Sequence, residues 1–249
     1  MKILHVINHY HENFGYQENF LAVNQKKLGH ETLIVTSDYY FPFPDYDKSV
    51  GHILGKRKIG SGVFFDKNIK IIRKKSYFQN KTNPNFVWFS LRKELFKFKP
   101  DIIHIHNPFN LFLFEIFFFQ KKIGYKIFID SHHDYSVEKN KYRYLKKIYY
   151  LSWNLIYNLI YSKKRVSKFL PITNSASRWL KEKISIQDDK IEISRLGVDL
   201  DTMNYDHNLE NYFREKHNLQ NKMIIVNAGK QKPEKKINEI IKIAIKANK

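Results

Sequence analysis

Histidines and a glycine stand in the segments that follow several predicted strands. Their chemistry suits the binding of a polar ligand. Gly15 precedes a predicted helix, and the unpaired N–H groups and the dipole at a helix N-terminus favour a phosphate. A plain turn glycine is the alternative. His106 and the pair His132 and His133 carry imidazoles that can hydrogen-bond a hydroxyl group. Histidines that only hydrogen-bond within their own loops are the alternative.

Two lysines near the end of the chain could bind a second anionic group. Residues 224–249 predict a strand, a turn that carries Gly229, Lys230 and Lys235, and an amphipathic helix. Two cations in one turn before a helix would suit a phosphate or another anionic group. Because the chain has 44 Lys and Arg residues, ordinary surface lysines are the alternative.

Several widespread motifs do not occur, which narrows the function classes. The sequence has no G-x-G-x-x-G after its first strand, no G-x-x-x-x-G-K-[ST], no G-x-S-x-G and no H-E-x-x-H. This argues against a simple dehydrogenase, a P-loop ATPase, an α/β-hydrolase and a zincin. With no cysteine, disulfides, thiolate zinc sites and a cysteine nucleophile are excluded. The Asp-x-Asp strings at 45–47 and 199–201 fit turns better than a divalent metal site, so no metal is expected.

Short apolar runs alternate with helical patterns along the chain. The predicted strands are 3–7, 33–36, 69–72, 102–105, 126–129, 169–172, 191–193 and 223–226. Helices are predicted up to a stop at Gly29, over 87–98, after Pro108 and from Asn174. This alternation predicts an α/β fold, a doubly wound parallel sheet of the Rossmann-like kind. Ligands of such sheets lie beyond the carboxyl ends of the strands. Residues 38–62 predict a long loop that could contain one short element.

Charge and hydropathy leave the choice of partner open. The net charge of +20 fits either an anionic partner or a lysine-rich composition without functional meaning. The longest apolar run, residues 109–119, is too short to span a bilayer, so we expect a soluble or peripheral protein. Residues 139–168 predict a basic, aromatic helix with Tyr149, Trp153 and Ile156 on one face. That face could pack on the sheet, which we favour, or lie in a membrane interface.

Taken in order, short motifs along the whole chain resemble those of one enzyme family. They are GYQE at 15–18, GHE at 29–31, KPDIIHIH at 99–106, DSHHDY at 130–135, ITNS at 172–175, SRLGVD at 194–199, NAGK at 227–230 and PEKK at 233–236. In this order they closely resemble the family 4 glycosyltransferases, retaining enzymes of the GT-B fold. Each motif is weak alone, whereas the ordered set is strong.

The resemblance implies two domains that bind different substrates. Residues 1–200 would form an acceptor-binding domain, and residues 201–249 would form a linker and the first βα unit of a donor-binding domain. The implied catalytic residues are His133 and its neighbour His132. The implied contacts to the donor phosphates are Gly15, Gly229, Lys230 and Lys235, and the implied substrate-binding residues are His106, Asp134, Asn174 and Arg195.

This sequence departs from the family pattern in three places. Tyr16 stands where the family usually has a second glycine, and Lys230 stands where it has an arginine. The family's pair of donor-binding glutamates has no counterpart, since residues 236–249 contain Glu239 as their one acid. We therefore expect a truncated donor domain.

The expected function is sugar transfer with retention from a nucleotide sugar to a glycan or lipid-linked acceptor, in cell-envelope polysaccharide synthesis. No cofactor or metal is expected. The expected location is the cytoplasm, including the inner face of the membrane, and the expected partners include an anionic membrane surface and a complementing donor-domain subunit. The alternative is a non-catalytic module that binds a glycan or another subunit. A nucleic-acid-binding protein would rest on charge alone.

Overall fold

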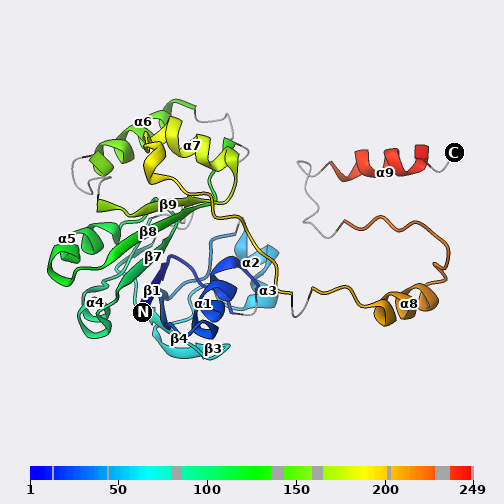
Figure 1. Cartoon of the computed structure of the whole chain (residues 1–249), viewed down its shortest axis with the longest axis horizontal. Coiled ribbons are helices and arrows are strands. Elements are labelled where there is room, and N and C mark those ends of the chain that lie inside the picture. Colours follow the sequence, from blue (N-terminus) through cyan, green and yellow to red (C-terminus); the bar gives the residue numbers. More distant parts are fainter. Residues whose placement is uncertain are drawn as a thin grey trace. The chain divides into compact units, whose positions relative to one another are not determined.

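The computed structural model describes residues 1–12, 14–43, 45–79, 86–135, 143–158, 165–200, 203–227 and 236–247. The chain divides into two compact units, Met1–Gly197 and Val198–Lys249 (Figure 1). Gly229, Lys230 and Lys235, which we predicted to face the donor phosphates, lie outside the described residues.

A mostly parallel sheet organises the first unit. It has seven strands in the order β3-β4-β2-β1-β7-β8-β9, and all neighbours are parallel except β3 and β4. Their bounds are β1 Lys2–Ile7, β2 Glu31–Ser37, β3 Gly62–Asp66, β4 Ile69–Lys74, β7 Ile102–His106, β8 Lys126–Ser131 and β9 Lys168–Pro171. The predicted α/β fold with a doubly wound parallel sheet is therefore confirmed.

Helices cover both faces of this sheet. The helix α1 (Gln17–Lys27) packs over β2 and β4 on one face. On the other face a larger core joins the sheet to α4 (Arg92–Phe98), α5 (Leu113–Ile123), α6 (Arg143–Ile156) and α7 (Asn174–Ile184). Successive residues of a strand point to opposite faces, so Ile103 and Ile105 of β7 enter the larger core while His104 and His106 point toward the side of α1.

Some predicted boundaries differ from the structure. The predicted helix over 87–98 begins only at Arg92, because Val87–Trp88 forms β6 and pairs with β5 (Phe78–Gln79). The predicted strand over 191–193 is reduced to one bridge between Phe169 and Ile191, followed by irregular chain. The loop 38–62 contains two single-turn helices, α2 (Tyr46–Ser49) and α3 (Gly51–Leu54), rather than one short element.

The structure shows whether the aromatic face of α6 packs on the sheet or is free to lie in a membrane interface. Trp153 is 4% exposed and Tyr157, just beyond the helix, is fully buried in the larger core. The prediction of a helix packed on the sheet is confirmed. The alternative, that this same face lies in a membrane, is wrong because protein already covers it.

The second unit has little regular structure in its described residues. It contains α8 (His207–Lys216), capped by Asp206, and α9 (Ile237–Ala247). The predicted strand over 223–226 is irregular and exposed, because a strand needs a neighbour to satisfy its backbone hydrogen bonds. None of the described residues of this unit is buried. In the described parts of both units, no helix is long and apolar enough to cross a membrane.

Candidate active site

The carboxyl ends of four adjacent strands bring the predicted strand-end residues to one edge of the sheet. The strands β1, β7, β8 and β9 are parallel neighbours, so the segments that follow them share that edge. The chain crosses from β1 toward β2 on one side, and β7 pairs on the other side. This boundary between β1 and β7 is a topological switch point, where ligands of doubly wound sheets bind.

Gln17 and His132 meet across this switch point. Gln17 opens α1 after β1, and His132 follows β8, yet Oε1 of Gln17 lies 2.9 Å from Nε2 of His132. The contact ties the first turn of α1 to the end of β8. Sequence reasoning missed Gln17, whose one signal was its place in the GYQE motif.

The turn before α1 is built around Gly15. Its φ is +67°, a conformation that other residues adopt only with strain, and a Cβ there would lie 3.4 Å from the ring of Phe20. The next residue, Tyr16, begins the helix, and its backbone N–H donates to Oδ1 of Asn19. The Tyr16 ring turns toward His11, with ring centroids 6.2 Å apart. An aromatic ring therefore stands beside the N-terminus of α1.

We predict that Gly15→Ala lowers stability by about 1 kcal/mol, because alanine is strained at positive φ. For a chain of this size that corresponds to a loss of roughly 2–4 °C in melting temperature, measurable by circular dichroism. Gly29→Ala is the matched control, since Gly29 ends α1 with a φ of +84° and should cost a similar amount. If Gly15 also faces the donor phosphate, only Gly15→Ala will weaken nucleotide binding. Equal nucleotide affinity in both variants would make Gly15 a plain turn residue.

His133 lies between two aromatic rings. Its ring centroid is 5.2 Å from that of Phe109 and 5.4 Å from that of Trp179. Burial, with the neighbouring His132, lowers the pKa of His133 to about 4, so the imidazole is neutral at physiological pH. Its Nδ1 is buried and has no hydrogen-bond partner among the described residues. A buried polar atom without a partner is uncommon in folded proteins and suits a group that awaits a ligand. Asp134, predicted to bind substrate, is half-buried beside it.

Three histidines and an aspartate form a buried ladder on the α1 side of the sheet. Asp130 Oδ2 lies 2.6 Å from His106 Nδ1 and 3.4 Å from His104 Nε2. His106 Nε2 lies 3.0 Å from His5 Nδ1, and His5 Nε2 lies 2.7 Å from Gln25 Oε1 on α1. We predicted His106 to contact substrate. Both of its ring nitrogens are instead engaged within the ladder, so a role in positioning fits it better.

The charge state of the ladder follows from these contacts. Burial alone would raise the pKa of Asp130, but the imidazoles of His106 and His104 have the larger effect and hold this pKa well below its usual range. Burial alone would lower the pKa of His106, but the Asp130 carboxylate has the larger effect and raises this pKa above its ordinary value. Burial and the neighbouring imidazoles lower the pKa of His5 and of His104. The ladder therefore pairs the Asp130 carboxylate with His106, whose pKa is raised, beside two rings whose pKa is lowered.

This ladder is poorly arranged for a metal ion. The rings of His104 and His106 are stacked, with centroids 4.5 Å apart and planes 9° apart. A metal lies close to the plane of each imidazole that binds it, at about 2.0–2.1 Å from the nitrogen. Two parallel rings cannot both direct a nitrogen at one such point unless one of them rotates.

Asp130 also fixes the turn that follows β7. Its Oδ1 accepts a hydrogen bond from the backbone N–H of Asn107, whose φ of 108° is unusual for a residue with a side chain. The Asn107 side chain in turn accepts from the N–H of Phe109. The ladder thus connects α1 to the β7 turn at the switch point. Sequence reasoning missed this role for Asp130, because hydrogen bonding between strands is not visible in a single sequence.

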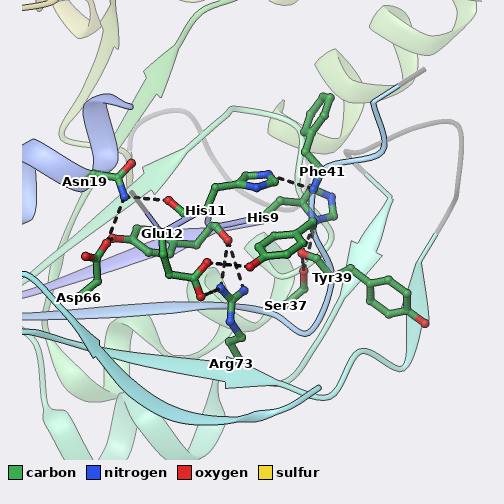
Figure 2. A network of polar contacts seen from close by, with 11 residues as sticks. His9, His11, Glu12, Asn19, Ser37, Tyr39, Phe41, Asp66 and Arg73 are labelled. Atoms are coloured by element: carbon green, nitrogen blue, oxygen red, sulfur yellow. Dashed lines mark hydrogen bonds and ion pairs between the residues drawn. The ribbon is translucent and has the colours of Figure 1, made fainter. Parts of the chain in front are cut away.

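A second polar network lies at the carboxyl ends of β1, β2 and β4 (Figure 2). Arg73 of β4 donates to the carboxylate of Glu12 and to the carbonyl of Tyr10, while Tyr40 donates to the other Glu12 oxygen at 3.0 Å. His11 accepts from the backbone N–H of Phe41 at 3.1 Å. The network therefore fixes the start of the loop 38–62 against the segment that follows β1.

His11 is the buried centre of an aromatic group in this network. Its ring stacks on Tyr40 with centroids 4.7 Å apart, and its Nδ1 has no partner among the described residues. Burial, with the nearby Arg73, lowers the pKa of His11 to about 4, so this ring is neutral at physiological pH. Phe14, Tyr16 and Phe41 stand exposed around it. Exposed aromatic faces beside buried polar atoms suit an acceptor with both apolar and hydroxyl groups.

Two predicted substrate residues share a pocket at the end of β9. The pocket has a volume of about 400 Å³ and is lined by Ile172, Thr173, Asn174, Arg195 and Leu196. Thr173 caps α7 by accepting from the N–H of Ala176. Arg195 and Asn174 thus line one pocket although they lie 21 positions apart in the sequence.

Comparisons with known proteins identify the family and the fold of this chain. A family model described as Glycosyltransferase Family 4 matches residues 20–202. A glycosyltransferase from Rickettsia africae ESF-5 shares 19% identity, with a TM-score of 0.51 over 87% of this chain and 49% of that chain. The Anabaena protein Alr3699/HepE, solved with UDP-glucose, shares 10% identity and a TM-score of 0.51 over 89% of this chain and 50% of its own.

A sucrose-phosphate synthase from Thermosynechococcus elongatus is similar to the same extent. It shares 12% identity, with a TM-score of 0.52 over 88% of this chain and 52% of that chain. No curated protein matches the chain. This chain spans about half the length of the solved glycosyltransferases it matches, and at these identities the likeness shows the fold alone. Because the family model covers well over half of the chain, the protein belongs to glycosyltransferase family 4, and its sheet is the Rossmann-like domain of a GT-B fold.

Proposed function

We propose that this chain takes part in the transfer of a sugar, with retention, from a nucleotide sugar to a glycan or lipid-linked acceptor of the cell envelope. The observation that carries the proposal is the family match over residues 20–202, which spans the strand ends at the switch point. HepE was solved with UDP-glucose, which supports a hexose linked to UDP as the first donor to test. The proposed location is the cytoplasm, including the inner face of the membrane.

The proposed roles follow from the chemistry of each residue. Retention requires the acceptor oxygen to bond to the face of the anomeric carbon from which the diphosphate leaves. The neutral imidazole of His133 would hydrogen-bond a hydroxyl of the transferred sugar. Gly15 and the start of α1 would face the donor phosphates, and Lys230 and Lys235 would neutralise the leaving diphosphate.

Arg195 and Asn174 would bind the substrate from their shared pocket. The exposed aromatic residues around His11 would contact the acceptor. With two lysines to offset the diphosphate charge, no metal is needed in this scheme.

Titration calorimetry with UDP, GDP and their sugar conjugates tests the proposal. We predict micromolar binding of one nucleotide, a loss of at least tenfold in affinity for Lys230→Ala and for Lys235→Ala, and no change in the presence of EDTA. Lys236→Ala is the matched control, because Lys236 is exposed and its contact is a surface ion pair with Glu239. Absence of binding by the chain, or an equal loss in the control, would contradict the proposed donor site.

A second candidate function is supported by the second unit. None of its described residues is buried, and Met223, Val226 and Ile243 are strongly exposed. This favours a non-catalytic module that binds a glycan or another subunit. Glycan binding without binding of any nucleotide would support this alternative over the first proposal.

A further inference from the structure

His11 carries a buried hydrogen-bond donor that has no acceptor among the described residues. The residue is 2% exposed, and its Nε2 accepts a hydrogen bond from the backbone N–H of Phe41 at 3.1 Å. A ring nitrogen that accepts carries no proton, so the single proton of the neutral ring is on Nδ1. That Nδ1 is buried and is the atom without a partner. Because a buried donor without an acceptor is costly, Nδ1 suits a ligand that supplies an oxygen.

Aromatic rings from two segments surround this histidine. After β1, the rings of Phe14 and Tyr16 have centroids 5.0 Å and 6.2 Å from that of His11. After β2, the centroid of Phe43 lies 5.8 Å from that of His11 and 5.1 Å from that of Phe41. Figure 2 shows the Phe41 ring turned outward from the polar network. Phe14, Tyr16 and Phe41 are 38%, 37% and 36% exposed, so each presents ring surface to solvent. We call His11 and these four rings the His11 aromatic group.

The charges that act on His11 are already paired. Burial lowers the pKa of His11 most, and the further shifts come from Arg73 and Glu12. These two side chains form an ion pair with each other. Arg57 of the following loop lies over the ring of Tyr39, which is not part of the His11 aromatic group. His11 therefore offers a ligand a neutral donor and not a cation.

We propose that the His11 aromatic group binds an uncharged pyranose residue of the acceptor. The C–H groups on one face of the sugar would pack on the negatively polarised face of an aromatic ring, and an oxygen of the same sugar would accept from Nδ1 of His11. A lipid chain would leave this donor without a partner, whereas a lipid phosphate would favour a cation.

This inference rests on the proposed sugar transfer and narrows its acceptor to a neutral sugar. His11, Phe14 and Phe41 lie outside the short motifs that this chain shares with its family. The preference would therefore come from residues particular to this chain.

The test is saturation-transfer NMR of the full chain with the methyl glycosides of glucose, galactose, mannose and N-acetylglucosamine, with and without UDP. We expect saturation transfer to at least one glycoside, strongest at the protons of one face of its ring. Phe14→Ala and Phe41→Ala should each weaken this binding roughly three- to tenfold.

Two variants of His11 separate its nitrogens. His11→Gln keeps an acceptor for the Phe41 N–H but removes the donor at the position of Nδ1, so it should weaken sugar binding by about fivefold or more. His11→Asn places an amide N–H at the position of Nδ1, so it should retain more of the binding than His11→Gln.

Phe118→Ala is the matched control. Phe118 is 77% exposed on α5, and its loss should leave sugar binding unchanged. Melting temperatures of Phe14→Ala and Phe41→Ala should stay near that of the parent, because both rings are partly exposed. These two variants therefore decide the question if the His11 variants fail to fold.

Three results would overturn the inference. They are absence of saturation transfer to all four glycosides, an equal loss with Phe118→Ala and Phe41→Ala, and displacement of the sugar by inorganic phosphate, which would indicate an anion site. Titration with nucleotides is a separate measurement. Nucleotide binding without sugar binding contradicts this inference alone, whereas sugar binding without nucleotide binding contradicts the proposed donor site and leaves this inference standing.

Discussion

His133→Gln should lower donor turnover by about 100-fold or more, with little change in the affinity for the nucleotide alone. The neutral imidazole between Phe109 and Trp179 keeps a buried Nδ1 for which the described residues supply no partner. If that atom bonds the transferred sugar, its loss affects the sugar and the transition state, not the nucleotide. The measurements are nucleoside diphosphate release and calorimetry with UDP compared with UDP-glucose.

The control for this variant is the adjacent histidine. His132 is exposed and its Nε2 lies against Gln17, so His132→Gln should reduce turnover by less than about tenfold. A larger loss for His132→Gln would assign the sugar contact to His132 and make His133 a packing residue. Equal and small losses in both variants would remove this pair from the reaction altogether.

Asp130→Ala should destabilise the first unit by about 3–5 kcal/mol, the largest stability effect we expect from one side chain. The carboxylate is the partner of His106 and also accepts from the Asn107 N–H. Its removal leaves the buried imidazole of His106 and the Asn107 N–H without their shared partner, and burial then lowers the pKa of His106. Urea unfolding followed by circular dichroism measures the loss.

Two further variants separate the charge from the hydrogen bonds. Asp130→Asn keeps an oxygen for the Asn107 N–H but removes the charge, so it should cost less than the alanine change. Asp188→Ala removes a surface carboxylate that pairs with Lys181 at 2.6 Å, and it should cost less than about 1 kcal/mol. If Asp130→Ala were as mild as Asp188→Ala, the buried ladder would contribute little to stability.

The pH dependence of the Asp130→Asn effect has a defined sign. Because the folded pKa of Asp130 is depressed, its stabilisation is present above the unfolded pKa and is lost as the pH falls through the folded pKa. The raised pKa of His106 acts in the opposite direction, since its contribution is present below the unfolded pKa and is lost as the pH rises through the folded one. The cost of Asp130→Asn should therefore shrink at strongly acidic pH, and also above the folded pKa of His106.

Local patterns in the sequence were sufficient for the parallel sheet and for most of its helices. Apolar runs without polar alternation predicted buried strands, and Gly29 marked the end of α1. The inward face of α6 was predicted through Trp153 because helical spacing shows which side chains share a face. The ordered motifs also indicated family 4, which the family model confirms. The roles assigned to Gly15, His133, Asn174 and Arg195 are still predictions.

Tertiary structure decided which polar groups are available and which apolar faces are uncovered. His106 contacts His5 and Asp130 through its two ring nitrogens because β7 pairs with β1 and β8, and no local pattern shows this. The contact of His132 with Gln17 joins residues separated by 115 positions, beyond the reach of any local pattern.

The residues 223–226 have strand propensity, but no strand of the described part of the chain pairs with them, so they stay irregular. The apolar side of α6 made by Ile148, Leu151 and Leu155 could be identified as outward only after Trp153 was found in the core. The elements and the family could be predicted from the sequence, since these depend on neighbouring residues and short motifs. The working site and the exposed faces depend on contacts between distant segments, which only the folded chain creates.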